Sequence, residues 1–259
     1  MKTAFVILAH ATDSGAESVV RSLVERHGFG AVLIVRPETL SAASWSHRVT
    51  STGRASTRLT LPGSEPLEDT RVAAVLNRIR YLPVPRFHRA SAKDRDYAGA
   101  EMQALVASWL AGLGKRVVHV VREHPWLTPM LPLQHWAHPA ASCGLPVATR
   151  AAFSSSSLAS QRVDRDSHTT TAEPGPIDNT ATTILVAGNR VDGQLAGTFG
   201  QRCLRTARLL GFPLLEFQFA TQEGRAVLTH VEPMPSLHEP WATSLTIDLL
   251  ETIAAGSPS

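Results

Sequence analysis

The sequence predicts an α/β protein with an N-terminal parallel-sheet domain and a smaller C-terminal α+β part. Three observations favour this fold class. An apolar strand, an amphipathic helix and a second apolar strand follow one another over residues 4–35, an order typical of a parallel α/β layer. Residues 72–121 repeat this order. Residues 213–237 alternate between apolar and polar side chains around a glycine turn, which is the pattern of an antiparallel β-hairpin.

The first strand is expected at Ala4–Leu8, because its residues are apolar and are soon followed by polar ones. Asp13 or Ser14 can cap a helix that runs to about His27, and glycines follow that helix directly. Ala31–Val35 is the second expected strand. The turn after the first strand lacks the glycine-rich patterns of dinucleotide-binding and P-loop proteins, so neither chemistry is supported there.

The middle of the chain is less regular, and residues 41–70 are rich in Ser, Thr, Gly and Pro. One weak edge strand, two further strands and two helices are expected here from apolar periodicity. Their ranges are Arg58–Leu61, Val72–Leu76, Asp94 or Asp96 to Leu113, Arg116–Val121 and Leu133–Ser142.

Residues 148–182 are polar and lack periodicity, so we expect a flexible linker there. This divides the chain into an α/β domain at 1–147, the linker, and an α+β part at 183–259. In the last part we expect four elements or pairs of elements. They are a hairpin at 183–197 with its turn at 188–193, a helix at 200–210, the hairpin at 213–237 and a helix at 240–254.

The hairpin at 213–237 has an expected three-residue loop, Gln222–Gly224, in which glycine can take a positive φ. Pairing of Thr221 with Arg225 would place Glu216 opposite His230. One face would then be polar and the other apolar, since side chains alternate along a strand. The expected polar face is Glu216, Gln218, His230 and Glu232, and the apolar face is Leu215, Phe217, Phe219, Val227 and Val231.

Several side chains on these elements are candidates for binding. Glu216, His230 and Glu232 could hold a metal ion, or they could form a polar sheet face that is solvated or packed on a partner chain. Asn77 and Arg78 follow a parallel strand at its carboxyl end, where open α/β sheets bind ligands. The arginines at 202, 205 and 208 could bind an anion or form a solvated helix face.

The composition excludes several classes of protein. The 259 residues carry a net charge of only +3, and the basic residues are scattered, so nucleic acid is not an expected partner. No window of about 18 apolar residues is present and the N-terminus lacks a signal-peptide pattern, so no membrane is expected either. Cys143 and Cys203 fit no metal spacing and are expected to be buried free thiols. A cytoplasmic protein is the resulting expectation.

The order of elements resembles an ATP-grasp protein. ILAHATDSGAESVVRSLVERHG, VAAVLNRIR, DYAGAEMQALVASWLAGLGKRVV and HWAHPAASCGLPV are similar to the pre-ATP-grasp domain of carboxylate–amine ligases related to the glutamate ligases that modify ribosomal proteins. TILVAGNRVDG, CLRTARLLGFPLLEFQF and VLTHVEPMPSL are similar to the end of the ATP-grasp core. The resemblance implies that the hairpin is the floor of a nucleotide site that binds Mg²⁺ and phosphates.

The sequence departs from that family in two places. His230 stands where the family has Glu, Glu232 stands where it has Asn, and only Glu216 keeps the acidic type. Between residues 146 and 183 the family has a small subdomain with two phosphate-binding lysines, whereas the lysines of this chain are at positions 2, 93 and 115. Arginine could substitute for lysine, and the candidates are Arg150, Arg162, Arg165 and Arg190.

These departures lead to three hypotheses. The first is a truncated, degenerate ATP-grasp homologue without a cofactor, which acts as a non-catalytic accessory partner of a ligase or other biosynthetic enzyme, or as a homo-oligomer. The second is an active ATP-dependent carboxylate–amine (peptide) ligase with Mg²⁺ on Glu216 and Glu232. The third is a metal-binding protein that uses Glu216, His230 and Glu232 as ligands.

Overall fold

The computed structural model describes residues 4–53, 55–83, 88–118, 131–148 and 177–256. The N-terminal half holds two sheets and four helices within these ranges. Its elements are β1 (Ala4–Leu8), α1 (Ser14–His27), β2 (Val32–Val35), α2 (Pro37–Ala42), β3 (Ser44–Val49), β4 (Ala55–Thr60), β5 (Leu67–Glu68), β6 (Val72–Asn77), α3 (Ala92–Leu113) and α4 (Leu133–Ser142).

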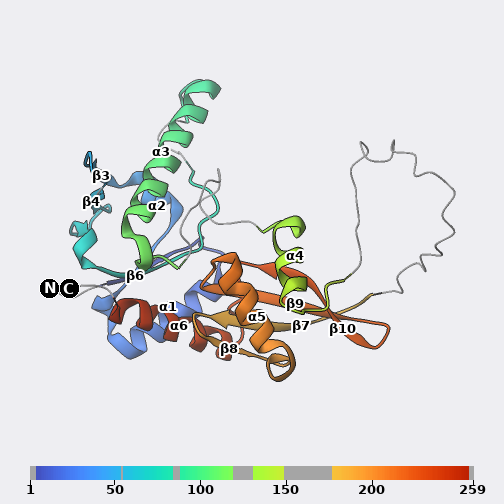
Figure 1. Cartoon of the computed structure of the whole chain (residues 1–259). Coiled ribbons are helices and arrows are strands. Elements are labelled where there is room, and N and C mark those ends of the chain that lie inside the picture. The colour runs from blue at the N-terminus through green and yellow to red at the C-terminus, as the bar shows by residue number, and fades with distance from the viewer. Residues whose placement is uncertain (1–3, 54, 84–87, 119–130, 149–176, 257–259) are drawn as a thin grey trace, which may run out of the picture.

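The C-terminal half holds one antiparallel sheet with the strand order β10-β9-β7-β8, flanked by helices (Figure 1). Its elements are β7 (Ile177–Ala187), β8 (Arg190–Gly193), α5 (Ala196–Leu210), β9 (Leu214–Gln222), β10 (Arg225–Glu232) and α6 (Pro240–Ala255). The mixed α/β architecture confirms the predicted fold class. Of the helices in the described ranges, none combines the length and apolar character that a bilayer-spanning segment needs.

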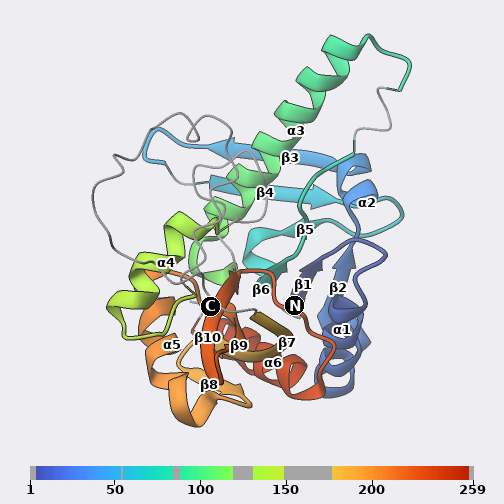
Figure 2. The same ribbon diagram turned by 90° about the vertical axis from the view of Figure 1, so that its right-hand side faces the viewer.

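The parallel sheet has the order β2-β1-β6 and is covered on both faces. Phe5 and Ile7 of β1 share one core cluster with α1 and α6, whereas Val6 and Leu8 belong to a second cluster with α3 and β4. The two clusters alternate along β1 because successive side chains of a strand point to opposite faces. Figure 2 shows α1 and α6 below this sheet and α3 crossing the antiparallel sheet above it.

The antiparallel sheet β3-β4-β5 was not predicted, since only a weak strand at Arg58–Leu61 was expected in this region. Trp45, Leu59 and Leu67 face the core, and most of the side chains between them are Ser, Thr or Arg. Strands with so few apolar positions resemble a polar loop in the sequence. The sheet is nevertheless stable in this setting, because α3 covers its apolar face.

Two other expectations concern residues 116–197. Of the fourth expected strand, at Arg116–Val121, residues 119–121 lie outside the described residues, and Val117 forms a parallel bridge with Val75. The hairpin at 183–197 has a tighter turn than expected, at Gly188 and Asn189, so that 190–193 is strand and α5 already begins at Ala196. Most of the expected linker lies outside the described residues, but β7 includes residues 177–182.

The register of the hairpin β9–β10 also differs from the prediction. Its loop has two residues, Glu223 and Gly224, with φ of 51° and 74°, and Arg225 pairs with Gln222. Positive φ at both positions gives a turn whose twist matches the strands. A β-bulge between Leu228 and His230 shifts the pairing again.

The new register changes which side chains face each other. Glu216 lies opposite Glu232 rather than His230, and His230 lies opposite Gln218. All four residues of the predicted polar face still share one face. On the apolar face Leu228, which pairs with Phe219, takes the place predicted for Val227, because Val227 pairs with Ala220.

Candidate functional site

Glu216 is a buried carboxylate held by two protein donors. Its Oε1 accepts a hydrogen bond from Gln218 Nε2 at 2.8 Å, and its Oε2 accepts one from the backbone N–H of Ser236 at 2.8 Å. The side chain is only 5% exposed. The segment 233–236, which follows β10, therefore folds back over the polar face of the hairpin.

Glu232 and His230 form an ion pair on the same face. Glu232 Oε1 accepts from the N–H of Met234 at 2.8 Å, and its Oε2 lies 3.5 Å from His230 Nε2. The hydrogen bond and charge of Glu232 raise the pKa of His230 against the effect of partial burial. Burial acts to raise the pKa of Glu232, but hydrogen bonds from His230 and Met234 and the charges of His230 and Arg80 outweigh it, so this pKa is lowered.

The predicted metal set therefore lies together on one sheet face. In the described ranges, however, no three His, Cys, Asp or Glu side chains are grouped so that they could hold a metal ion. The carboxylate oxygens of Glu216 and Glu232 are directed toward protein donors in this arrangement. The metal site remains a prediction.

Arg78 links the parallel sheet to the segment that covers the hairpin. Its Nε and Nη2 donate to the two carboxylate oxygens of Asp13 at 2.7 and 3.2 Å, and its Nη1 donates to the carbonyl oxygen of Pro235 at 3.0 Å. Asp13 is also the N-cap of α1 and accepts from Ala16 N at 2.9 Å. Burial acts to raise the pKa of Asp13, but the hydrogen bond and charge of Arg78 outweigh burial and lower it.

Asn77 lies beside Arg78 at the end of β6 and is completely buried. Its Oδ1 accepts from the N–H of Ile79 at 3.2 Å, which shapes the turn that leaves the strand. Because segment 233–236 contacts Arg78, Glu216 and Glu232, five predicted residues gather in one place. We call this place the joint, and it comprises Asn77, Arg78, Glu216, His230 and Glu232.

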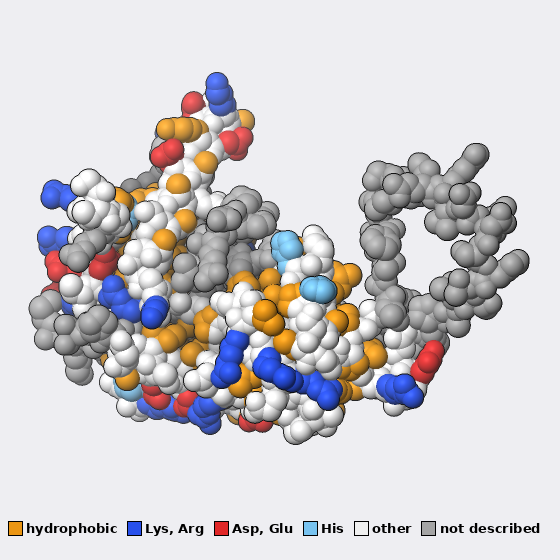
Figure 3. All heavy atoms as spheres, in the orientation of Figure 1, with side chains coloured by type: hydrophobic (Ala, Val, Ile, Leu, Met, Phe, Trp, Pro, Cys, Tyr) orange, Lys and Arg blue, Asp and Glu red, His pale blue; other side chains and the backbone are white. Residues whose placement is uncertain are grey.

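Arg190 and Arg202 lie away from the joint in structural roles. Arg190 of β8 pairs with Asp248 of α6, in a network that also includes Arg26 and Glu251. Arg202 of α5 donates from Nη1 to the carbonyl oxygen of Gly144 at 3.1 Å and lies over the ring of Phe199. Figure 3 shows basic side chains in a row over α5, the helix that carries Arg202, Arg205 and Arg208.

The sequence reasoning missed Asp13 and Arg80 as members of this region. Asp13 was expected only as a helix cap, although it follows β1 at the same sheet edge as Asn77 and Arg78. That placement was a usable signal, since the carboxyl ends of parallel strands meet at one edge. His10 lies at this edge too, and its Nε2 is buried without a hydrogen-bond partner in the part of the chain that the structure describes.

A largely apolar pocket of about 280 Å³ opens beside His230. It lies between the start of α4 and strand β10, and the chain after α4 pairs with β10 at this point through Val147 and Leu228. Its lining residues are Leu131, Pro132, Leu133, Trp136, Ala148, Leu228, Thr229 and His230. The pocket could take up an apolar side chain next to a charged rim.

Comparison with solved structures supports an ATP-grasp-like fold. No protein-family model matches the sequence, and no curated protein sequence matches it. Solved structures match over almost the whole chain at 10–14% identity, a likeness that concerns the fold alone.

One of these structures is a RiPP-associated ATP-grasp ligase from Chryseobacterium gregarium in complex with ADP and a leader and core peptide. It has a TM-score of 0.70 and 10% identity, over 99% of this chain and 98% of that one. The macrocyclase MdnC from Microcystis aeruginosa, bound with precursor peptide MdnA, has a TM-score of 0.65 and 12% identity, over 96% and 100%.

The ATP-grasp ligase PsnB, complexed with a minimal precursor, Mg and ADP, has a TM-score of 0.63 and 14% identity, over 98% of this chain and 99% of that chain. The likeness to these structures confirms the ATP-grasp fold expected from the sequence. The matches extend over nearly the full length of each ligase, and the expected truncation is not confirmed by them.

Proposed function

We propose that this chain is an ATP-grasp-fold protein that binds a peptide or protein partner at the joint and does not itself carry out ATP-dependent ligation. It would act as an accessory partner of an active ligase. The observation that carries this proposal is that the two candidate metal-binding carboxylates are hydrogen-bonded to other groups of the protein. Glu216 accepts from Gln218 and Ser236, and Glu232 pairs with His230.

The positions of the lysines support the same proposal. Phosphate transfer relies on several positive groups gathered around a hard cation. Lys93 belongs to the first turn of α3, whose N-terminal end projects away from the body of the molecule in Figure 1. Lys115 is exposed in the turn after α3. Neither lysine is therefore placed to neutralise phosphates at the joint, and no cofactor is required by this function.

The neighbouring structures suggest the kind of partner. The C. gregarium ligase was solved with a leader and core peptide and MdnC with a precursor peptide. A peptide would suit the joint of this chain as well, because the apolar pocket beside His230 offers room for one side chain next to a polar face. Binding to a protein subunit, a homo-oligomer and a cytoplasmic location belong to the same proposal, while nucleic acid and membranes do not.

A thermal-shift titration with Mg-ATP tests the non-catalytic part. A ligand that binds only the folded state stabilises it and so raises the melting temperature. At a ligand concentration of a hundred times the Kd, the free energy of unfolding increases by about 2.7 kcal/mol. We expect that nucleotide shifts the melting temperature of neither the wild type nor Glu216→Gln, each compared with its own nucleotide-free sample. ADP release coupled to amide formation by the pure protein would overturn the proposal.

The second candidate function is an active peptide ligase, and the observed register favours it. Glu216 and Glu232 lie directly opposite each other across the hairpin. Mg²⁺ is usually bound through one or two carboxylates together with substrate phosphates. When bound, the ion would neutralise phosphate charge, and arginines would replace the lysines. This function predicts Mg-ATP binding that Glu216→Ala abolishes and Arg202→Ala, distant from the joint, leaves unchanged.

The third candidate is a transition-metal site formed by Glu216, His230 and Glu232. The chemistry of the set is suitable, since imidazole and carboxylate groups bind Zn²⁺ and Mn²⁺. The side chains would have to turn away from their protein donors to meet one ion. Metal analysis of the purified protein is the direct measurement, with His230→Asn as the variant that must lose the metal.

A further inference from the structure

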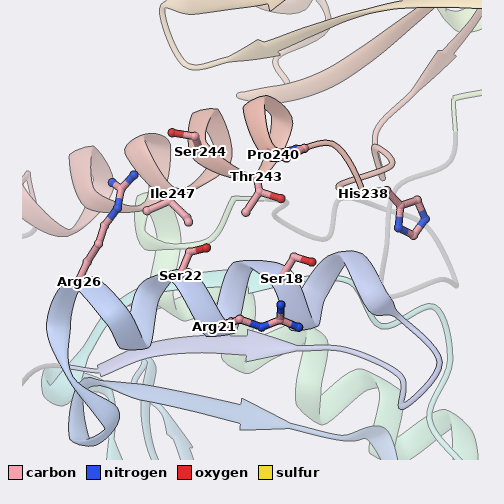
Figure 4. Close-up of a pocket in the computed structure, with 9 residues that line it drawn as sticks. All are labelled: Ser18, Arg21, Ser22, Arg26, His238, Pro240, Thr243, Ser244 and Ile247. Carbon is pink, nitrogen blue, oxygen red and sulfur yellow. The ribbon is translucent and has the colours of Figure 1, made fainter.

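A second, polar pocket lies between α1 and α6. Its volume is about 220 Å³. Figure 4 shows its walls as two helices side by side, with His238 at one end and Arg26 reaching across at the other. The lining residues are Ser18, Arg21, Ser22, Arg26, His238, Pro240, Thr243, Ser244 and Ile247.

The lining of this pocket offers hydrogen-bond donors and no carboxylate. Three of its side chains carry or can carry positive charge, at positions 21, 26 and 238, and four carry hydroxyl groups. Guanidinium, imidazolium and hydroxyl groups are the side chains that bind tetrahedral oxyanions. Pockets that take cations would need the opposite balance, with carboxylate and carbonyl oxygens in the wall.

The charged groups of the pocket differ in how far they are already neutralised. Arg26 donates to Asp248 at 3.1 Å and to Glu251 at 3.2 Å, so the neighbouring helix balances its charge. His238 Nδ1 lies 3.3 Å from Ser14 Oγ, and its ring also interacts with the charge of Asp13. Arg21, within the described part of the chain, has no carboxylate partner. Its charge is therefore available to a ligand.

The hydroxyl groups divide in the same way. Ser18 donates to the carbonyl oxygen of Ser14 at 3.2 Å, and Thr243 donates to that of Leu237 at 2.9 Å. For Ser22 and Ser244, the described contacts include no such acceptor. Ser22 points from α1 toward α6, whereas the hydroxyl of Ser244 is directed away from α1 (Figure 4). Ser22 can therefore donate to an anion between the helices without breaking a bond of the fold.

From this arrangement we propose that the pocket between α1 and α6 binds a phosphoryl group, with Arg21 and Ser22 as its principal donors. The group would be free phosphate or the phosphate of a small phosphorylated molecule. The volume exceeds the space of one phosphate, because it equals that of roughly seven water molecules at about 30 Å³ each. Thr243 and Ile247 are buried side chains that form a firm floor. This site is independent of the function proposed for the joint.

Isothermal titration calorimetry of the full chain with inorganic phosphate, glycerol phosphate and acetate, at constant ionic strength, tests the proposal. We expect binding of the phosphates with a Kd of about 1 mM or tighter, and no binding of acetate. Tighter binding of glycerol phosphate would identify a phosphorylated molecule as the ligand, and equal binding would identify free phosphate. Both results support the site.

Two variants make the assignment specific. The double variant Arg21→Ala/Ser22→Ala should weaken phosphate binding at least tenfold, because it removes both proposed donors. The variant should keep the fold, since both residues lie outside the core. Arg58→Ala removes an exposed arginine of β4 and should leave the affinity unchanged. Equal losses of phosphate affinity in the two variants would mean that phosphate is attracted by the general positive charge, and this would contradict the proposed site. So would the absence of heat at phosphate concentrations up to about 10 mM.

Discussion

Arg78 is the residue that connects the two halves of the molecule at the joint. Its side chain is 8% exposed, and that of its partner Asp13 is 15% exposed. A buried guanidinium needs a carboxylate and further acceptors, since removal of one partner leaves an uncompensated charge away from water. Asp13 supplies the carboxylate, and the carbonyl oxygen of Pro235 is a further acceptor. Arg78 therefore positions both the N-terminus of α1 and segment 233–236, which covers the hairpin.

Replacement of Asp13 by Asn should lower the free energy of unfolding by about 3 kcal/mol at neutral pH. Asn still caps α1, so the loss reports the Arg78 pair. Because the folded-state pKa of Asp13 is lowered, its contribution is present above the unfolded pKa of about 3.9 and is lost as the pH falls through the folded pKa. Urea unfolding at several pH values measures this.

The matched control for that variant is Glu17→Gln, which removes the exposed partner of Arg36. An exposed pair contributes at most about 1 kcal/mol, so this variant should be nearly neutral. Equal losses for the two variants would contradict the special role of the buried pair.

The His230–Glu232 pair gives a second prediction for single residues. Glu232→Gln should lower the pKa of His230, because Glu232 is the main cause of its elevation. The raised folded pKa means that His230 contributes stability below its unfolded pKa of about 6.5, and that this contribution is lost as the pH rises through the folded value. An NMR titration of the His230 ring in both proteins measures the shift, and an unchanged pKa would rule out the ion pair.

At the level of elements, the turn between β9 and β10 decides which side chains form the polar face. Its two residues both have positive φ, yet one of them is Glu223, a residue that rarely takes this conformation. The sequence pattern suggested a three-residue loop in which Gly224 takes the positive φ. A shift in the turn and the bulge after Leu228 then moved the pairing of Glu216 from His230 to Glu232.

A pair of turn variants tests this geometry. Glu223→Asn should stabilise the protein by about 0.5 kcal/mol, because Asn tolerates the left-handed region that Glu occupies there. Gly224→Ala should destabilise it by about 1 kcal/mol for the same reason. Thermal unfolding of the two variants measures the sign of each change in stability. If Glu223 did not have a positive φ, Glu223→Asn would be neutral.

The predictability of the elements followed the strength of their apolar patterns. β1, α1 and α4 begin and end where the sequence placed them, because their apolar patterns and the polar or glycine residues that follow them are local features. The sheet β3-β4-β5 was not predictable from its mostly polar strands, and its stability comes from burial of Leu59 against α3. The contact of Arg78 with Pro235 joins residues far apart in the chain, so no local pattern could indicate it.

Across the whole molecule, α6 connects the two halves of the core. Ile247 and Leu250 are completely buried in one cluster with Ile7 and Leu76 of the parallel sheet and Leu185 of the C-terminal sheet. The boundary expected from the sequence separates the chain at residues 148–182, but the described core continues across it. The sequence indicated the amphipathic helix and could not indicate which sheets it joins.

This shared core predicts a single unfolding transition. Ile247→Ala should reduce stability by about 3 kcal/mol through the lost apolar contacts and the remaining cavity. The loss should be the same when unfolding is followed by tryptophan fluorescence, which includes Trp109 in the N-terminal half, and by far-UV circular dichroism. Two separate transitions, with only one of them shifted by the variant, would show that the halves fold independently.

The position of α6 also has a consequence for the newly made chain. During synthesis the strands β1 and β6 emerge long before α6, so the apolar face that α6 covers stays exposed until α6 has been made. Arg78 can contact Asp13 once residue 78 has left the ribosome, but the carbonyl oxygen of Pro235 emerges more than 150 residues later. Until then the nascent protein exposes an apolar surface. Chains with such a surface aggregate readily and are the ones that chaperones bind.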